Sequence, residues 1–236
     1  MKAMNRILAT LTLVLMAATA PAQTPVGKMY TPGAFDRLEV DGSAKVKLSQ
    51  GDRDQVFITG DDRAQQSVEL EVVNNRLMIH PSGGWKFWNN SRLQIDVQMR
   101  QVSQVILSGA SDLHAPGPIK SDKLYIGISG AGLARFDELN VDQMKFDISG
   151  AGDGQLAGTA GELKLSVSGK GKLLAEQLRA ARAHVSISGV GNANLWVTDT
   201  LRVSISGVGT VDYWGQPKLE RSTSGLGSIN GHGDKR

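Results

Sequence analysis

The stretch from His184 to Thr210, HVSISGVGNANLWVTDTLRVSISGVGT, contains the pentapeptide ISGVG twice, with the two copies 18 residues apart. A short sequence that recurs at a nearly fixed period is typical of proteins that stack small structural units. The Ser-Gly pair of this pentapeptide recurs through the second half of the chain, at spacings of 18 to 21 residues. The seven copies begin at Ser108, Ser129, Ser149, Ser168, Ser188, Ser206 and Ser224.

Apolar residues alternate with other residues on both sides of each Ser-Gly pair. With the Ser as position zero, the inner copies are apolar at positions five, three and one before it, and mostly apolar at positions five and seven after it. A period of two is typical of a strand with one buried face, so each copy is predicted to contain two short strands. The predicted inward residues before the pair are Leu124, Ile126, Ile128, Met144, Phe146, Ile148, Leu163, Leu165, Val167, Ala183, Val185, Ile187, Leu201, Val203 and Ile205.

The Ser-Gly-x-Gly sequence between the two strands predicts a tight corner. Because glycine adopts positive φ at no steric cost, we expect positive φ at the corner glycines, and we expect the Ser hydroxyl to hydrogen bond to the local backbone. The 14 positions from five before the Ser to eight after it are constant, whereas the segment that leads to the next copy varies from four to seven residues. We interpret these connecting segments as loops.

Units of 18 to 21 residues with two strands and a corner predict an all-β fold, a parallel β-helix or solenoid with rungs about 4.8 Å apart. The L-x-x-L-x-L pattern of leucine-rich repeats, which have a similar period, is absent. One segment, Lys172–His184 (KLLAEQLRAARAH), has the composition of a helix. Its apolar residues, such as Leu173 and Ala183, nevertheless fall at inward positions of the repeat, so a strand is predicted.

Composition divides the chain into segments. The first 22 residues combine two basic residues, an apolar run and the small-residue sequence Ala20-Pro21-Ala22, which is typical of a secretory signal peptide. The predicted organisation is a signal peptide at residues 1–22, a linker at residues 23–34, a single β-solenoid domain at residues 35–231 and a polar tail at residues 232–236. Within the domain we expect a more irregular β portion at residues 35–104 and regular rungs at residues 105–231.

Both ends of the domain depart from the repeat. LEVDGSAKVKL, residues 38–48, fits the pattern with Asp41-Gly42 in place of Ser-Gly and predicts a degenerate first copy. Asn74-Asn75 lies between two strand-like runs and predicts a tight hairpin turn, because Asn tolerates the left-handed conformation. The inward positions of the last copy hold Leu219, Arg221 and Thr223, which predicts a polar cap at that end.

Charge and composition exclude several classes of function. Removal of the signal peptide, which holds Lys2 and Arg6, reduces the 26 basic residues to 24 against 23 acidic residues, a net charge of +1. Because no block of Lys and Arg is present, we expect no nucleic-acid partner. The chain has no Cys and therefore no disulfide or thiolate metal site. No later apolar run approaches the roughly 20 residues of a membrane-spanning helix, so no integral membrane segment is expected in the mature chain.

Three of these stretches also carry a resemblance to a known family. They are FDRLEVDGSAKVKLSQGD at residues 35–52, NNRLMIH at residues 74–80, and the tandem ISGAG and ISGVG corners that end in SGLGSINGHG. On these residues the chain resembles the head GIN domain family, known as "putative auto-transporter adhesin", over roughly residues 35–231. The resemblance implies a secreted bacterial β-solenoid domain with an adhesin-like role.

The titratable residues form no pattern typical of catalysis or metal binding. The four histidines share no ligand spacing and no phosphate-binding loop is present, so we expect no metal, no cofactor and no catalytic residue. Many parallel β-helices act on polysaccharides through paired carboxylates. The acidic candidates are Asp137, Asp147, Asp153 and Glu176. Asp137 and Glu176 share one column two rungs apart, which predicts a separation of roughly 10 Å, near the upper limit for an inverting pair.

Aromatic residues are the main candidates for a binding site. Trp196 and Trp214 both follow the Ser of their copies by eight residues, so we expect them to face outward on adjacent rungs with stacked indoles. Trp85, Phe87 and Trp88 lie in the Gly- and Asn-rich segment GGWKFWNN, residues 83–90. Exposed aromatic rings on a rigid scaffold bind sugar rings or protein partners. The alternative is that this segment folds over Trp196 and Trp214 and buries them.

These observations together predict an exported, non-enzymatic β-solenoid domain in the periplasm or at the cell surface. The expected partner is a glycan or an envelope protein, bound through the five aromatic residues. Two alternatives remain open: a β-helix enzyme that acts on polysaccharide, and a structural envelope protein that assembles with copies of itself as a homo-oligomer.

Overall fold

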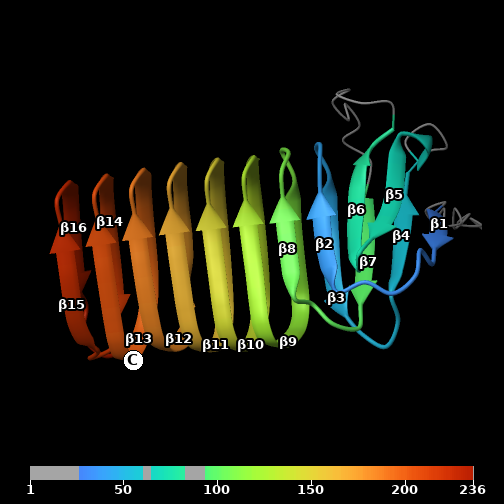
Figure 1. Ribbon diagram of the computed structural model, residues 1–236. Coiled ribbons are helices and arrows are strands. Elements are labelled where there is room, and N and C mark those ends of the chain that lie inside the picture. Colours follow the sequence, from blue (N-terminus) through green and yellow to red (C-terminus); the bar gives the residue numbers. More distant parts are fainter. Residues whose placement is uncertain (1–26, 61–64, 83–93, 236) are drawn as a thin grey trace, which may run out of the picture.

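The computed structural model describes residues 27–60, 65–82 and 94–235 (Figure 1). The predicted signal peptide and the candidate residues Trp85, Phe87 and Trp88 lie outside the described residues. Within them the strands pair into one continuous sheet that winds around a single elongated core. No helix among the described residues is long and apolar enough to cross a membrane. The predicted all-β parallel solenoid with an irregular N-terminal portion is confirmed.

Five strands of the regular rungs are long and run from one Ser-Gly corner to the next, and the others are shorter. Neighbouring strands are parallel, and equivalent positions of the repeat pair with each other: Ile187 is the partner of Val167 on one side and of Ile205 on the other. The strands are β8 (Gln104–Leu107), β9 (Asp112–Ile128), β10 (Ala131–Ile148), β11 (Ala151–Val167), β12 (Lys170–Ile187), β13 (Val190–Ile205), β14 (Val208–Trp214), β15 (Lys218–Thr223) and β16 (Leu226–Gly231).

Each rung contributes to two half-sheets. The corners form the upper edge of the solenoid in Figure 1, and the bends within the long strands form the lower edge. We call the residues that lead into a corner the pre-corner half-sheet and those that follow it the post-corner half-sheet. Inward side chains of the two half-sheets fill the core, where residues such as Phe136 and Phe146 are almost completely buried. All fifteen predicted inward residues before the corners belong to this core.

The segment with helical composition, Lys172–His184, lies within strand β12. Its residues Leu173, Ala175, Ala183 and Val185 are buried in the core. The predicted strand is therefore confirmed, because a helix would break the parallel pairing with β11 and β13 and would lose the burial of these side chains.

The connecting segments are not the loops that their variable length predicted. From β9 to β13 the strands continue through them, and Ile119, Leu139, Val141 and Leu178 add to the buried core. Differences in length are absorbed by shifts of the pairing register, for example between Phe136 and Leu139. A β-bulge accommodates extra residues while the strand on either side keeps its partner. Bulges at the lower edge therefore allow unequal rungs to share one regular upper edge.

The corner glycines are required for a different reason from the one predicted. Positive φ occurs at Gly42 in the degenerate first copy, but at none of the first glycines of the seven Ser-Gly corners. At Gly189 an added Cβ would lie 2.0 Å from the carbonyl oxygen of Gly169, one rung before. That oxygen also accepts the N–H of Val190 at 2.9 Å, so it has no freedom to move away. The glycines are needed because successive corners approach too closely for any side chain.

The corner serines also differ from the prediction. Ser129, Ser149, Ser168, Ser188, Ser206 and Ser224 are exposed. Within the described part of the chain, none of these six hydroxyls hydrogen bonds to the local backbone or to another side chain. The corner N–H groups are satisfied instead by the preceding rung: Ser188 and Gly189 both donate to the carbonyl of Val167. Hydrogen bonds between successive rungs thus take the place of the expected local turn. The sequence of a single corner does not reveal these bonds.

The N-terminal portion extends both half-sheets beyond the first rung. Its strands are β1 (Gly27–Tyr30), β2 (Arg37–Val40), β3 (Lys45–Gln50), β4 (Gln55–Thr59), β5 (Val68–Val73), β6 (Arg76–Pro81) and β7 (Gln94–Met99). β2 and β3 pair in parallel with β8 and β9, which confirms a degenerate first copy around Asp41-Gly42. β6 and β7 add one parallel strand to each half-sheet, and β5, β4 and β1 continue as antiparallel strands. Asn74 and Asn75 have φ of 49° and 61°, which confirms the predicted tight turn between β5 and β6.

The C-terminal rung, β15 and β16, ends the sheet. Each of these strands pairs with one neighbour, and no strand of the described chain covers its other edge. Arg221 and Thr223 occupy inward positions there but are exposed. A charged residue at an inward position of an edge strand discourages the addition of a further strand, so this rung fits the predicted polar cap.

Replacement of a corner glycine should be severe. Gly189→Ala is expected to lower the free energy of unfolding by about 3 kcal/mol or more, because the added methyl group collides with backbone atoms rather than with a flexible side chain. Gly117→Ala is the matched control, since an added Cβ there meets no atom within 4 Å. Urea unfolding followed by circular dichroism measures both, and similar losses in the two variants would contradict the close-approach explanation.

The alternation of inward and outward residues predicts a second contrast. Ile187 is fully buried and its neighbour Ser186 is half-buried and faces outward. Ile187→Asp is expected to cost more than about 4 kcal/mol or to prevent folding, because it buries a charge without a partner. Ser186→Asp should cost less than about 1 kcal/mol in the same unfolding experiment. Equal effects would disprove the register.

Candidate ligand-binding surface

A column of aromatic side chains lies on the outer surface of the post-corner half-sheet at its C-terminal end. Trp196 at the start of this column pairs in register with Trp214 on the next rung. The ladder continues beyond β16, because the N–H of His232 donates to the carbonyl of Tyr213 at 2.9 Å. Both indoles are half-buried. We call Trp196, Trp214 and His232 the aromatic column; each follows the Ser of its copy by eight residues.

The expected stacking of the two indoles is not the contact that forms. The ring stacked on Trp214 is His232, with 4.7 Å between ring centroids and 21° between the planes. Above Trp196 lies Lys235, whose Nζ is 5.4 Å from the ring centroid, a distance typical of a cation–π contact. The two tryptophans lie on adjacent rungs, as predicted. Each indole nevertheless contacts the C-terminal residues, because the chain folds back over the column.

The residues that fold back are 232–235, which we call the C-terminal strap. The N–H of Gly215 donates to the carbonyl of Gly233 at 2.8 Å, and Gln216 donates to Asp234 at 2.8 Å. Gly233 has φ of 74°, a conformation that favours glycine and allows the chain to reverse. Lys235 then reaches the backbone carbonyl of Glu176 in β12. The strap therefore spans from the last rung to β12 and partly covers the two indoles.

The other three candidate aromatic residues belong to a different part of the chain. Trp85, Phe87 and Trp88 lie between β6 and β7, outside the described residues. β6 and β7 flank the first rung of the solenoid, whereas Trp196 and Trp214 lie on its last rungs (Figure 1). β6 and β7 thus lie at the opposite end of the described sheet from the strands that contain Trp196 and Trp214.

A hydrogen-bonded carboxylate fixes the ring of His232. Its Nε2 lies 2.8 Å from Oδ1 of Asp212, which also accepts a hydrogen bond from Asn230 at 3.1 Å. The hydrogen bond from His232, assisted by that from Asn230, holds the pKa of Asp212 below its usual range, against the opposing effect of partial burial. Asp212 therefore orients the imidazole that stacks on Trp214.

Glu176 borders the column on its other side. The register of β12 and β13 shifts between Ala175 and Arg179, so Glu176 lies in a bulge next to Trp196. One of its carboxylate oxygens, Oε2, is buried without a hydrogen-bond partner in the described structure. A buried acceptor that lacks a partner is costly. Because this oxygen is closed off from solvent, a ligand could reach it only after its surroundings had moved.

The carboxylates considered for polysaccharide cleavage are mostly held in other interactions. Asp137 accepts hydrogen bonds from Arg135 and His114 at 2.7 Å, and these hold its pKa below the usual range. A general acid needs a raised pKa, so Asp137 is poorly suited to that role. Asp147 pairs with Lys145 at 2.6 Å, and Asp153 accepts the N–H of Lys172 at 2.8 Å.

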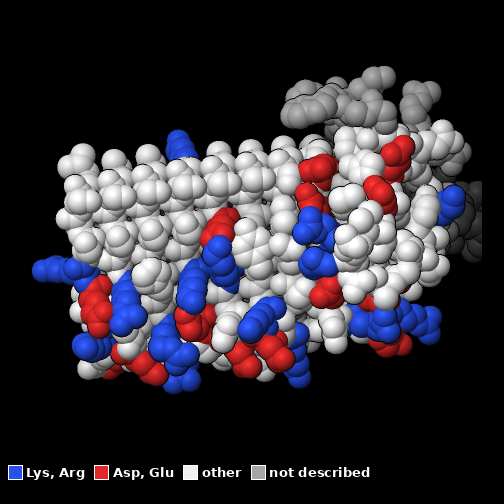
Figure 2. Space-filling model, viewed as in Figure 1, with Lys and Arg blue, Asp and Glu red and all other residues white. Residues whose placement is uncertain are grey.

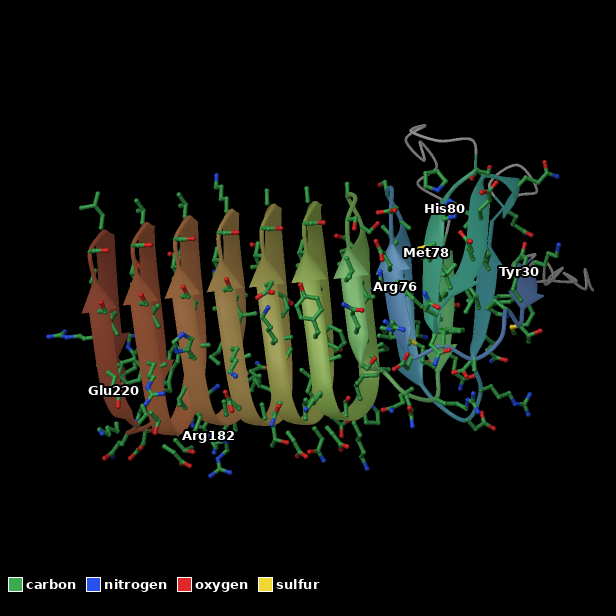
Figure 3. The ribbon with its side chains drawn as sticks, viewed as in Figure 1. Tyr30, Arg76, Met78, His80, Arg182 and Glu220 are labelled. Carbon is green, nitrogen blue, oxygen red and sulfur yellow. The ribbon has the colours of Figure 1, made fainter. Side chains whose placement is uncertain are left out.

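Metal ligands do not converge in the described residues: no group of three or more His, Asp or Glu side chains comes together. Charged side chains on the pre-corner half-sheet gather toward its lower edge, where Arg182 and Glu220 are labelled (Figure 3; charges in Figure 2). They form ion pairs such as that between Arg202 and Glu220 at 2.6 Å. These pairs are exposed, and exposed pairs of this kind contribute little to stability.

The site predicted from the sequence did not include two residues that contact the tryptophans, His232 and Lys235. The composition of residues 232–236 predicts a polar tail, whereas counting eight residues from Ser224 places His232 in the column. Lys235 and its contact with Trp196 depend on the course of the strap, and no periodic signal in the sequence marks that course. The tryptophans were found because they occupy equivalent positions of the repeat.

This architecture defines a parallel β-solenoid with short, regular rungs and an outward aromatic column. The chain belongs to the family described as "Putative auto-transporter adhesin, head GIN domain", which matches residues 34–217. The family resemblance drawn from the sequence is therefore confirmed.

Solved structures share this fold. A crystal structure described as a "putative adhesin" from Bacteroides fragilis NCTC 9343 is 23% identical, with a TM-score of 0.81, and covers 89% of this chain and 98% of its own. A "putative lipid binding protein" from Parabacteroides distasonis ATCC 8503 is 20% identical, with a TM-score of 0.68, and covers 89% of this chain and 97% of its own. No curated protein matches the chain in sequence. At these identities the likeness concerns the fold alone.

The lowered pKa of Asp212 predicts a pH dependence of stability. Because the folded-state pKa is below the unfolded value, the ionised carboxylate stabilises the fold above the unfolded pKa, and this contribution is lost as the pH falls through the folded pKa. Asp212→Asn should therefore lose less stability than the parent between about pH 5 and about pH 2, measured by urea unfolding. The control Asp142→Asn removes an exposed carboxylate for which the described residues show no ion pair. An acid response of Asp212→Asn identical to that of the parent would contradict the role of Asp212.

Proposed function

We propose that this protein is an exported, non-enzymatic, adhesin-like module of the periplasm or cell surface that holds an envelope or extracellular ligand on the flank of its solenoid. The signal-peptide pattern of residues 1–22 and the family membership support export. The pairing of Asp137 and Asp147 with cations supports a binding role over catalysis.

The observation that carries the proposal is the register of Trp196 and Trp214. Two half-buried indoles lie in register on adjacent strands of a rigid sheet, and the C-terminal strap covers part of each ring. Rings held in this way bind without losing side-chain freedom, which favours sugar rings and the apolar parts of protein partners. Carboxylates border the rings on both sides: Asp212 orients His232, and Glu176 lies in the bulge next to Trp196.

The test is retention of the purified protein on a panel of glycans, bacterial envelope fractions and phospholipid vesicles. Trp196→Ala/Trp214→Ala should reduce retention on the bound component by roughly tenfold or more, because two ring contacts are removed. Tyr125→Ala is the matched control, since Tyr125 is a half-buried aromatic residue of the pre-corner half-sheet. Circular dichroism confirms that each variant is folded.

Trp85→Ala/Trp88→Ala is measured beside these variants, because the sequence assigns a second candidate surface to Trp85, Phe87 and Trp88. Loss of retention in this variant alone would move the binding surface to that segment. Equal retention of the parent and both tryptophan variants would reject aromatic binding. Light scattering at several concentrations would then examine self-association, the remaining non-enzymatic alternative.

A further inference from the structure

A groove runs along the solenoid beside the corner edge, separate from the aromatic column. It crosses four rungs and has a volume of about 520 Å³. The backbone of the second glycine of each corner forms its floor, and the residues on either side of these glycines form its two walls. We call it the corner groove; its floor consists of Gly132, Gly152, Gly171 and Gly191.

A side chain at the floor positions of the corner groove would point into the core, where no space remains for it. An added Cβ at Gly171 would lie 2.2 Å from the carbonyl oxygen of Gly152, and one at Gly152 would lie 2.5 Å from Ile128. Glycine inside a strand often marks a place where another backbone approaches closely, and here that backbone belongs to the preceding rung. The groove therefore lies between the outward residues on either side of these glycines and repeats from rung to rung.

One rung places a lysine on each wall of this groove. Lys170 and Lys172 flank Gly171, and both residues line the groove at this rung. Lys170 also breaks a pattern, because the other corner tips are uncharged and form the pale ridge along the upper edge of Figure 2. The residues at these tips are Ala110, Ala131, Ala151, Lys170, Val190, Val208 and Leu226.

Neither ammonium group has an ion-pair partner in the described part of the chain, and both side chains are exposed. The nearest acidic wall residue is Asp153, one rung before, and its Oδ1 accepts the backbone N–H of Lys172 at 2.8 Å. Asn192, one rung after, offers an amide at the same wall. This section of the groove therefore combines two available cations with groups that hydrogen bond to hydroxyls.

We propose that the corner groove binds a linear polysaccharide that carries carboxylate groups, with the chain along the solenoid axis and a carboxylate between Lys170 and Lys172. A groove that crosses four rungs fits an extended polymer better than a compact ligand. The lysines recognise the carboxylate, and Asp153 and Asn192 recognise sugar hydroxyls. A nucleic acid fits poorly, because two lysines beside an aspartate do not form the basic track that a phosphate backbone needs.

The test uses isothermal titration calorimetry of the purified protein with polygalacturonate and with its fully methyl-esterified form, which has the same backbone without charge. The parent is expected to bind the acid and not the ester, with affinity that falls as salt is added. Lys170→Gln/Lys172→Gln should lose at least roughly tenfold in affinity, because two charge-assisted hydrogen bonds are removed. The control Lys120→Gln/Lys123→Gln removes the same charge from exposed lysines outside the groove.

Three results would overturn the proposal: no binding of polygalacturonate by the parent, equal binding of the acid and the ester, or equal loss in the two lysine variants. Trp196→Ala/Trp214→Ala is measured beside the lysine variants, because the proposed function assigns sugar rings to the aromatic column. If that variant alone loses binding, the acidic polymer occupies the aromatic column and the corner groove is not its site.

Discussion

The approach of one corner to the next is the constraint on which the rest of the structure depends. At the first glycine of each of the seven corners, an added Cβ would lie 1.8 to 2.1 Å from a carbonyl oxygen of the preceding corner. No side chain fits there, and the same oxygens accept the ladder hydrogen bonds of the following residues. The corners consequently stack as a straight edge. Because that edge is straight, outward residues at equivalent positions form straight columns, and both the aromatic column and the corner groove result from this alignment.

Much of the fold could be predicted because each buried position of the repeat recurs as an apolar residue in several copies. A single copy of Lys172–His184 reads as a helix, and its alignment with the neighbouring copies reverses that interpretation. The reason for the corner glycines could not be predicted, because a glycine required by positive φ and one required by close approach look the same in a sequence. The connecting segments misled for a related reason: variable length is typical of loops, yet Leu139 and Leu178 are buried in strands whose bulges absorb the difference.

The candidate site could be predicted only as far as it follows the repeat. Trp196 and Trp214 occupy equivalent positions, so their place on adjacent rungs could be derived by counting. Their actual contacts could not, because Lys235 and Glu176 are 59 residues apart and occupy unrelated positions of the repeat. Periodicity relates a residue to its equivalents in other rungs, whereas the strap is an aperiodic segment laid across them.

Opening of the C-terminal strap would expose both indoles of the aromatic column. A terminal rung of a solenoid contacts only one neighbour, so it opens at a lower free energy than the inner rungs. When this rung opens, His232 leaves Trp214 and Lys235 leaves Trp196 in the same event, since both belong to residues 232–235. A partner that binds only the uncovered indoles would therefore increase the population of molecules with an open last rung. A partner that contacts His232 and Lys235 would decrease that population. Hydrogen exchange at the last rung thus reports which face of the column a partner uses.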